Sequence, residues 1–298
     1  MKKRVLSLLL ALAMCLSLSV PASAVVPPED ALSEFAPYEE VNHAIGKTAL
    51  SIIENVETRQ YYEKHIRDMQ LELEEVTTKT SYIEEGLDGS GHFFSRVLNR
   101  EEVEQLKEIR VTPSSRNISS ENTRSSIRQL TVTLSKSRDA RGNYVLNGYA
   151  EWDTDPLTSD GYTHPYPGDD YLSIRWGGDD DLVATGYSFA GRYTDNSSMT
   201  GYLEEADEYG GFCWAFNERT ALFGKVMDHA SVVVVLDSTS PQLLNEETGA
   251  SLQYIHTYEE KTASWYVEFN GTNFSGGITL YNCASQWKMA APVSGIEY

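Results

Sequence analysis

Residues 130–135 read Leu-Thr-Val-Thr-Leu-Ser, and this strict alternation of apolar and polar side chains predicts a β-strand with one buried face. Successive side chains of a strand point to opposite faces of its sheet, so leucine and valine can enter a core while the hydroxyls stay outside. Val232 to Leu236 is continuously apolar, which is typical of a strand buried on both faces. The two-residue period recurs in five more segments: 145–152, 171–176, 212–216, 252–256 and 265–269.

These strands, with two weaker candidates at 182–193 and 278–283, bring the total to about nine. They are separated by turns rich in Gly, Asp and Asn, such as Gly210-Gly211 and Asn270-Gly271, with no long helix between them. This organisation predicts an antiparallel β-sandwich, or a barrel, over residues 127–298.

Residues 25–110 have a different period. Apolar side chains recur at three- and four-residue steps from Val41 to Val56, as one face of an α-helix requires, and a second amphipathic stretch covers 59–76. Asn99 and Glu102 have the spacing of a capping box, which predicts a short helix running to Ile109. We therefore expect a mainly helical N-terminal region and an α+β chain.

The segment 111–126 separates these two regions. It is rich in serine and threonine and contains Pro113, so it cannot bury enough apolar surface to offset the entropy lost on ordering. The sequence predicts an exposed Ser-rich linker here, with a domain boundary inside it.

The first 24 residues have the pattern of a signal peptide. Basic residues at 2–4 precede an apolar run at 5–20, and the small residues at 22–24 follow the helix-breaking Pro21. The run is shorter than the roughly 20 apolar residues that span a bilayer. We expect cleavage after Ala24, a secreted or cell-surface protein, and no membrane span in the mature chain, since no other segment is long and apolar enough.

The mature protein is strongly acidic. The formal charge of −20 includes three basic residues of the signal, so their removal leaves −20 minus 3, or −23. A surface of this charge repels nucleic acid and anionic lipid before any contact forms, and it favours cations and basic partners. Nucleic acid is therefore not an expected partner.

Two cysteines remain after the loss of Cys15 with the signal. Cys213 and Cys283 both lie in predicted strands and would meet an oxidising compartment, so they can form one disulfide. The alternative is a pair of buried thiols that act as small apolar side chains.

No motif of catalysis stands out. The segment Gly186-Tyr-Ser-Phe-Ala190 lacks the final glycine of a nucleophile elbow, and the six histidines are scattered without a metal-binding spacing. The sequence therefore predicts no catalytic residue and does not favour an enzyme.

Acidic loops form the first candidate site. Carboxylates on glycine-containing loops supply the hard, flexible oxygen ligands that Ca²⁺ prefers. The sequence predicts a possible calcium site among seven aspartates: Asp153, Asp155, Asp169, Asp170, Asp179, Asp180 and Asp181.

Tyrosines form the second candidate site. An exposed aromatic ring can stack on a sugar or anchor a protein interface, although many tyrosines only pack within a sheet. The residues expected at outward or loop positions of a ligand site are Tyr149, Tyr162, Tyr166, Tyr171 and Tyr187.

Three functional hypotheses follow. The first is a secreted or cell-surface bacterial binding protein that recognises an extracellular glycan or protein through its β domain. The second is a secreted polysaccharide hydrolase that uses two carboxylates on the β scaffold. In the third, the N-terminal helices act as a pro-region or inhibitory arm that masks the β domain.

Overall fold

The computed structural model describes residues 36–111, 124–153, 168–177, 181–218, 225–238, 247–258, 266–269, 278–281 and 286–297. All of them from Pro37 onward belong to one compact unit. The predicted signal peptide lies outside the described residues and stays a prediction. Within the described part of the chain, no helix has the length and apolar character that a membrane crossing requires.

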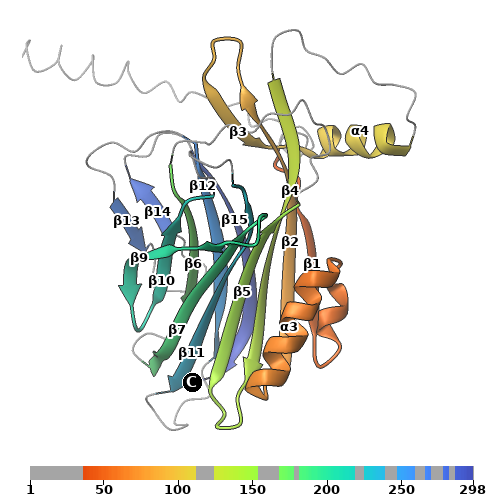
Figure 1. Ribbon diagram of the computed structural model, residues 1–298. Coiled ribbons are helices and arrows are strands. Elements are labelled where there is room, and N and C mark those ends of the chain that lie inside the picture. Colours follow the sequence, from red (N-terminus) through yellow and green to blue (C-terminus); the bar gives the residue numbers. More distant parts are fainter. Residues whose placement is uncertain are drawn as a thin grey trace, which may run out of the picture. The chain divides into compact units, whose positions relative to one another are not determined.

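Two antiparallel sheets face each other in this unit (Figure 1). The larger has the order β1-β2-β4-β5-β11-β7-β8, and β3 pairs with β2. Its strands are β1 (Glu40–Ile45), β2 (Glu72–Leu87), β3 (Phe93–Val97), β4 (Arg124–Arg138), β5 (Tyr144–Trp152), β7 (Leu182–Tyr193), β8 (Ser198–Met199) and β11 (Met227–Ser238).

The smaller sheet has the order β15-β12-β6-β10-β9. Its strands are β6 (Asp170–Trp176), β9 (Gly201–Asp207), β10 (Gly211–Phe216), β12 (Glu247–Thr257) and β15 (Gln286–Glu297). A separate pair is formed by β13 (Tyr266–Phe269) and β14 (Ile278–Tyr281). The predicted antiparallel β architecture is confirmed, and its arrangement is that of a sandwich.

The core between the sheets is made by the side chains that the two-residue period assigned to it. Leu130, Val132 and Leu134 of β4 are fully buried and pack in one cluster with Leu252 of the facing sheet. The sheets approach closely at Gly148 of β5, where an added Cβ would lie 2.4 Å from Leu252 Cδ1. Only a glycine fits there without displacing the facing leucine.

The expected mainly helical N-terminal region is not supported. Three of its segments are strands, since β1 covers 40–45, β2 covers 72–87 and β3 covers 93–97. β2 pairs with β4 from Glu72↔Arg138 to Leu87↔Arg124, so the chain on both sides of the expected linker builds one sheet. Residues 124–126 of that linker are part of β4, and 112–123 lie outside the described residues.

The same pairing bears on the expected inhibitory arm. β2 lies between β1 and β4 in the larger sheet, so residues 72–87 supply structure to the sandwich. Removing them would leave β4 with an unpaired edge and open the core. A removable arm therefore cannot extend over residues 72–87, and the hypothesis that the N-terminal helices form a pro-region stays a prediction.

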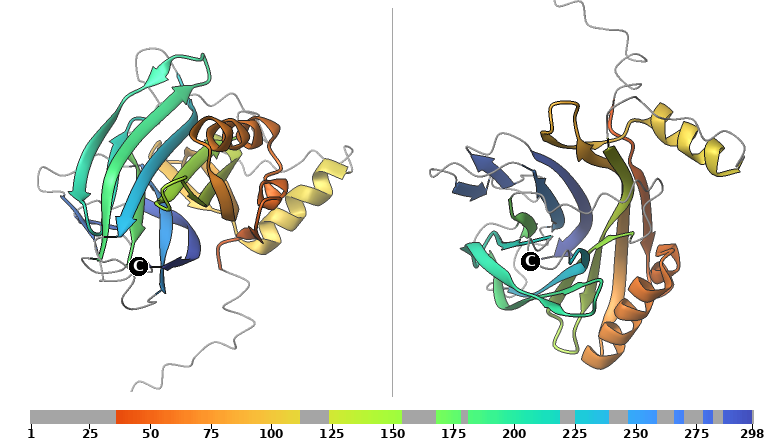
Figure 2. Two further views of the ribbon diagram at one scale, coloured as in Figure 1. Left: turned by 90° about the horizontal axis from the view of Figure 1, so that it is seen from below. Right: turned by 45° about the horizontal axis from the view of Figure 1, so that its top comes forward.

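Among the described residues, three helical elements accompany the sheets: η1 (Ala49–Ile52), α3 (Val56–Met69) and α4 (Arg100–Val111). Figures 1 and 2 both show α3 against the outer side of the larger sheet. Tyr62 of α3 is fully buried, and its hydroxyl lies 3.0 Å from Thr133 O and 3.2 Å from Asn147 O, so one proton is shared between two carbonyls. This contact anchors the helix to β4 and β5.

The capping box predicted for α4 is confirmed. Asn99 Oδ1 accepts a hydrogen bond of 3.0 Å from Glu102 N, and Glu102 Oε2 accepts one of 2.9 Å from Asn99 N. These two bonds satisfy amide donors that have no partner inside the helix.

Replacing Asn99 with alanine is expected to destabilise α4 by about 1 kcal/mol, because the side-chain acceptor is lost. Amide hydrogen exchange of the first turn, Arg100–Val103, should become about fivefold faster, as that free energy implies. The Asn99→Asp variant keeps an acceptor and should exchange like the wild type. Equal rates in the alanine variant would show that the cap contributes nothing.

A buried lysine ties the far end of the chain to the larger sheet. Lys136 of β4 is 6 % exposed and donates hydrogen bonds to Ser294 O at 2.5 Å and Gly295 O at 2.9 Å. Its ammonium also lies 3.3 Å from Glu75 Oε2, and Ser294 N donates to the same carboxylate. β2, β4 and β15 are thereby joined by one charged contact.

Candidate functional site

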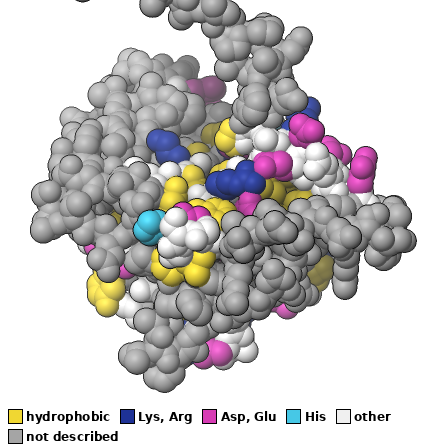
Figure 3. Space-filling model, turned by 90° about the horizontal axis from the view of Figure 1, so that it is seen from above, with side chains coloured by type: hydrophobic (Ala, Val, Ile, Leu, Met, Phe, Trp, Pro, Cys, Tyr) yellow, Lys and Arg dark blue, Asp and Glu magenta, His cyan; other side chains and the backbone are white. Residues whose placement is uncertain are grey.

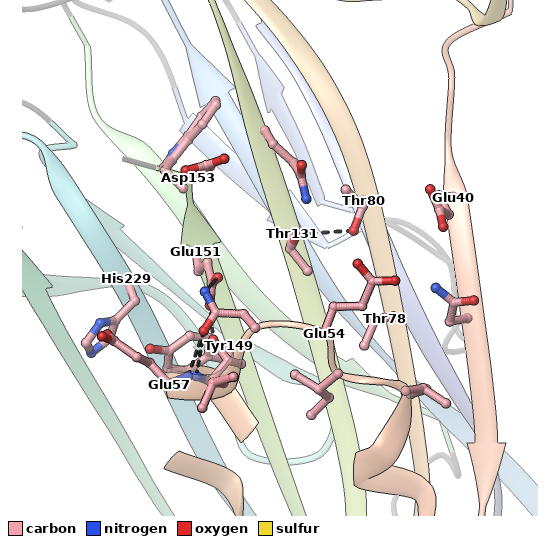
Figure 4. Close-up of a pocket in the computed structure, with 18 of the residues that line it drawn as sticks. Glu40, Glu54, Glu57, Thr78, Thr80, Thr131, Tyr149, Glu151, Asp153 and His229 are labelled. Carbon is pink, nitrogen blue, oxygen red and sulfur yellow. Dashed lines mark hydrogen bonds between the residues drawn. The ribbon is translucent and has the colours of Figure 1, made fainter. Parts of the chain in front are cut away.

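A pocket of about 540 Å³ opens on the outer face of the larger sheet, beside the N-terminal end of α3 (Figure 4). It is lined by side chains of β1, β2, β4, β5 and β11 and by the segment that leads into α3. Hydroxyls of Thr78, Thr80 and Thr131 lie on its sheet wall, on the face opposite to the core. Six carboxylates line it: Glu40, Glu54, Glu57, Glu151, Asp153 and Asp228.

Glu151 of β5 holds the helix entrance in place. One of its carboxylate oxygens accepts a hydrogen bond from Asn55 Nδ2 and the other accepts one from Thr58 Oγ1. Asn55 is the N-cap of α3, since its Oδ1 accepts from Glu57 N at 2.8 Å. Burial first, and then the charges of neighbouring carboxylates, Asp228 foremost, raise the pKa of Glu151 to about 7 against the lowering effect of the Asn55 hydrogen bond.

The pKa of Asp228 in β11 is shifted in the opposite direction. Its Oδ2 lies 2.9 Å from His229 Nδ1 and accepts a bond of 3.2 Å from Arg192. The hydrogen bond with His229 lowers the pKa of Asp228, and Arg192 adds to this effect. The pocket therefore combines a carboxylate that is ionised at neutral pH with one, Glu151, that is close to half protonated.

The described tyrosines of the predicted ligand site lie in different surroundings. Tyr149 lines the pocket but is only 5 % exposed, with its ring 4.9 Å from that of His229 and 4.7 Å from that of Tyr61. Tyr187 is 50 % exposed on β7, where its ring lies 4.3 Å from that of Phe212. Tyr162 and Tyr166 lie outside the described residues.

The outward position expected for Tyr171 is wrong, because this side chain is fully buried. β6 lies between β12 and β10, and every residue of the strand is buried. On such a strand, alternation does not separate a core face from a solvent face.

The seven aspartates of the predicted calcium site are dispersed in the described part of the chain. Asp153 lines the outer pocket, whereas Asp170 is buried on the interior side. Asp169 offers its carbonyl to Thr257 Oγ1 at 2.8 Å, and Asp181 precedes β7. Asp155, Asp179 and Asp180 lie outside the described residues, so calcium binding stays a prediction.

The predicted disulfide is likewise untested. Cys213 is fully buried in β10. Cys283 lies outside the described residues.

A second group of polar side chains lies inside the sandwich, at the end where β4 begins and β5 and β12 finish. Figure 3 looks onto the upper end of the molecule in Figure 1, where acidic and basic side chains lie beside apolar ones. We call the five residues the interior charge cluster. They are Glu85, Arg128, Asp170, Glu218 and His256, all at most 6 % exposed.

The imidazole of His256 stands at the centre of the interior charge cluster. Its Nδ1 lies 2.9 Å from Asp170 Oδ1 and 3.3 Å from Glu218 Oε2, and its Nε2 lies 3.4 Å from Glu85 Oε1. Arg128 donates a hydrogen bond of 3.0 Å to Glu218 and stacks over the Trp152 ring at 4.4 Å. The ion pairs of the interior charge cluster therefore link the two sheets across their shared core.

Protonation in the interior charge cluster departs from solution behaviour. Burial raises the pKa of Asp170 to about 7, although the charge of His256 opposes the rise. Burial would lower the pKa of His256, but the attraction and hydrogen bond of Asp170 outweigh it and hold that pKa well above its usual value. Tyr254 also donates to Asp170, and burial raises the pKa of its hydroxyl.

The sequence did not predict that these five residues share a site, and Asp170 alone among them belonged to the predicted calcium ligands. One signal was present, because His256 shares an alternating face with Leu252 and Tyr254, both fully buried. A histidine on an apolar face must find polar partners. Its partners come from three other segments, and a single sequence gives no information about which segments meet.

Comparison with known proteins gives little. No protein-family model matches the chain, and no curated protein matches it. Among solved structures, the collagen adhesin of S. aureus is similar at a TM-score of 0.24 and 9 % identity, over 74 % of this chain and 90 % of that one. At that score the likeness carries no argument about this protein.

Proposed function

We propose that this chain is a secreted or cell-surface binding protein whose outer pocket receives a positively charged segment of a protein partner. The observation that carries the proposal is the lining of the pocket. Six carboxylates gather there, and neither lysine nor arginine is among the described residues that line it. Such a concave acidic surface attracts cationic side chains before contact and orients them afterwards.

The polar walls suit an extended peptide. Hydroxyls and amides of Asn42, Thr78, Thr80, Gln129 and Thr131 follow three adjacent strands along the pocket. These groups can pair with the backbone of a bound segment while its lysine or arginine side chains meet the carboxylates.

A glycan is a less suitable ligand for this pocket. Sugar binding commonly uses an aromatic ring with an open face. Tyr149 is 5 % exposed and its ring already contacts Tyr61 and His229, so little of it remains for a ligand.

The proposal predicts that a lysine- and arginine-rich peptide binds the protein and that a neutral peptide of equal length does not. The double variant Glu57→Gln, Asp153→Asn should weaken binding about tenfold, since each lost ion pair contributes up to about 1 kcal/mol. Fluorescence anisotropy measures the affinity, and raising the salt concentration should weaken it further.

A control with the same change in net charge separates the pocket from general acidity. Glu63 and Asp237 are exposed and do not line the pocket. The variant Glu63→Gln, Asp237→Asn should bind like the wild type. Equal weakening in both double variants, or equal binding of the neutral peptide, would refute the proposal.

The chemistry of Glu151 supports a second candidate, a polysaccharide hydrolase. A carboxyl with a pKa of about 7 beside the ionised Asp228 is the pairing that glycosidases use for acid catalysis. Both oxygens of Glu151 already accept hydrogen bonds from α3 residues, which favours a role in holding the helix. Release of reducing sugar from cell-wall polysaccharides that disappears in Glu151→Gln would support the hydrolase, and release that survives would reject it.

A further inference from the structure

The interior charge cluster lies apart from the outer pocket. It has features of a metal site. One ligand atom each of Glu85, Glu218 and His256 lie within 4.8 Å of one another. No other such group of three occurs among the residues that the structure describes. The three come from β2, from the segment after β10 and from β12, so both sheets contribute.

The spacing of these atoms suits a small ion. Zinc binds nitrogen and carboxylate oxygen at roughly 2.0–2.2 Å, so two ligands of a tetrahedral site lie about 3.4 Å apart. His256 Nε2 lies 3.4 Å from Glu85 Oε1. The pair can therefore bind one ion with little movement of either strand.

Asp170 orients the imidazole as a metal site requires. Its oxygens lie 2.9 and 3.1 Å from His256 Nδ1, and it also accepts a hydrogen bond of 3.2 Å from Thr257 N. With Nδ1 held by Asp170, Nε2 faces Glu85 Oε1 at 3.4 Å, and an ion bound there would take the place of the Nε2 proton. A carboxylate that fixes the far nitrogen of a histidine is the usual support of a metal-binding imidazole.

Acidic side chains predominate in the interior charge cluster. It contains three carboxyl groups, Glu85, Asp170 and Glu218, and one guanidinium, Arg128, all at most 6 % exposed. Carboxylate oxygens and an imidazole nitrogen that are held together away from water are the ligands that divalent transition metals take in proteins.

We propose that Glu85, Glu218 and His256 bind one divalent transition-metal ion, and that this ion is Zn²⁺. An imidazole ligand suits zinc and the neighbouring transition metals, whereas calcium and magnesium take oxygen ligands almost exclusively. The aromatic rings around the interior charge cluster exclude water from the ion, with Trp287 5.0 Å and Trp152 6.3 Å from the His256 ring. Such a site joins the two sheets and is structural.

The test is refolding of the protein in the presence of Zn²⁺, followed by gel filtration and elemental analysis. We expect one equivalent of zinc to remain with the wild type and less than about a tenth of an equivalent with Glu85→Gln or Glu218→Gln. The control is His43→Gln, because His43 also lies near a carboxylate, 2.9 Å from Glu75, but its side chain is 46 % exposed. This variant should retain zinc as the wild type does.

Other outcomes would overturn the proposal. They are a wild type that retains no zinc, glutamine variants that retain as much as the wild type, or loss only in His43→Gln. If the glutamine variants fail to fold, the wild type with Co²⁺ in place of Zn²⁺ decides by X-ray absorption. Imidazole and carboxylate in the coordination shell support the site, and an all-oxygen shell rejects it.

Discussion

Replacing Arg128 with methionine is expected to lower the free energy of unfolding by about 3–5 kcal/mol, the usual loss when one partner of a buried ion pair is removed. The guanidinium lies 3.0 Å from Glu218 and 3.8 Å from Glu85, and both carboxylates are buried. Methionine fills a similar volume over the Trp152 ring but carries no charge. The two glutamates would then have to be buried without their cation, or the sandwich would have to open to water.

Denaturant unfolding in the presence of a chelator measures this loss without a contribution from metal. The matched control is Arg96→Met, since Arg96 pairs with Glu84 and Glu102 but its side chain is 48 % exposed. That variant should lose at most about 1 kcal/mol, as exposed ion pairs do. If both variants lost the same amount, burial of the interior charge cluster would not be what makes Arg128 important.

The second large effect is a loss of stability as the pH rises from about 4.5 to about 7, caused by Glu151. Its pKa is about 7 in the folded protein, against the ordinary value of 4.5 that applies to the unfolded chain. Between these values the folded state keeps a proton that the unfolded state has released. Stability is therefore highest at the acidic end and falls with rising pH, by an amount on the order of 3 kcal/mol at most.

The Glu151→Gln variant isolates this contribution. The amide cannot ionise, and it can still pair with Asn55 and Thr58. We expect the variant to match the wild type near pH 4.5 and to be the more stable of the two near pH 8, by thermal unfolding at constant ionic strength. The exposed Glu63→Gln provides a control that should follow the wild type at every pH. Parallel curves for Glu151→Gln and the wild type would contradict the assignment.

Much of the architecture is readable from side-chain alternation. Leu130, Val132 and Leu134 lie in the core because a strand with one apolar face has only one way to bury it. The cap at Asn99 was equally readable, since it depends on neighbours only three positions apart. Local patterns are predictable where local contacts decide the structure.

The errors arose where a pattern fits two structures. Val41, Ala44 and Ile45 have helical spacing, yet their segment forms β1 because it pairs with residues 75–80 of β2. Pairing of this kind overrides local propensity and is not visible in one sequence. Thr77, Thr78 and Thr80, in the pairing partner β2, did indicate a strand, because β-branched residues favour strands.

The two candidate sites also differ in how far the sequence predicts them. Tyr149 and Glu151 lie on one face of β5 and Asp153, just after the strand, continues the same two-residue period, so this shared wall could be predicted from the sequence. The interior charge cluster takes one residue from each of five segments. Its members come together only when the two sheets pack against each other.

The buried contact among Lys136, Glu75 and Ser294 has a consequence for how the protein folds. Glu75 and Ser294 are 219 positions apart, and the ammonium between them is buried. A growing polypeptide cannot complete this contact until residue 294 has been synthesised, so the sandwich cannot close progressively from its beginning. Folding should therefore be slow and late, as topologies dominated by distant contacts are. During that interval the unfinished protein exposes apolar surface, and incomplete folds of this kind are prone to aggregation.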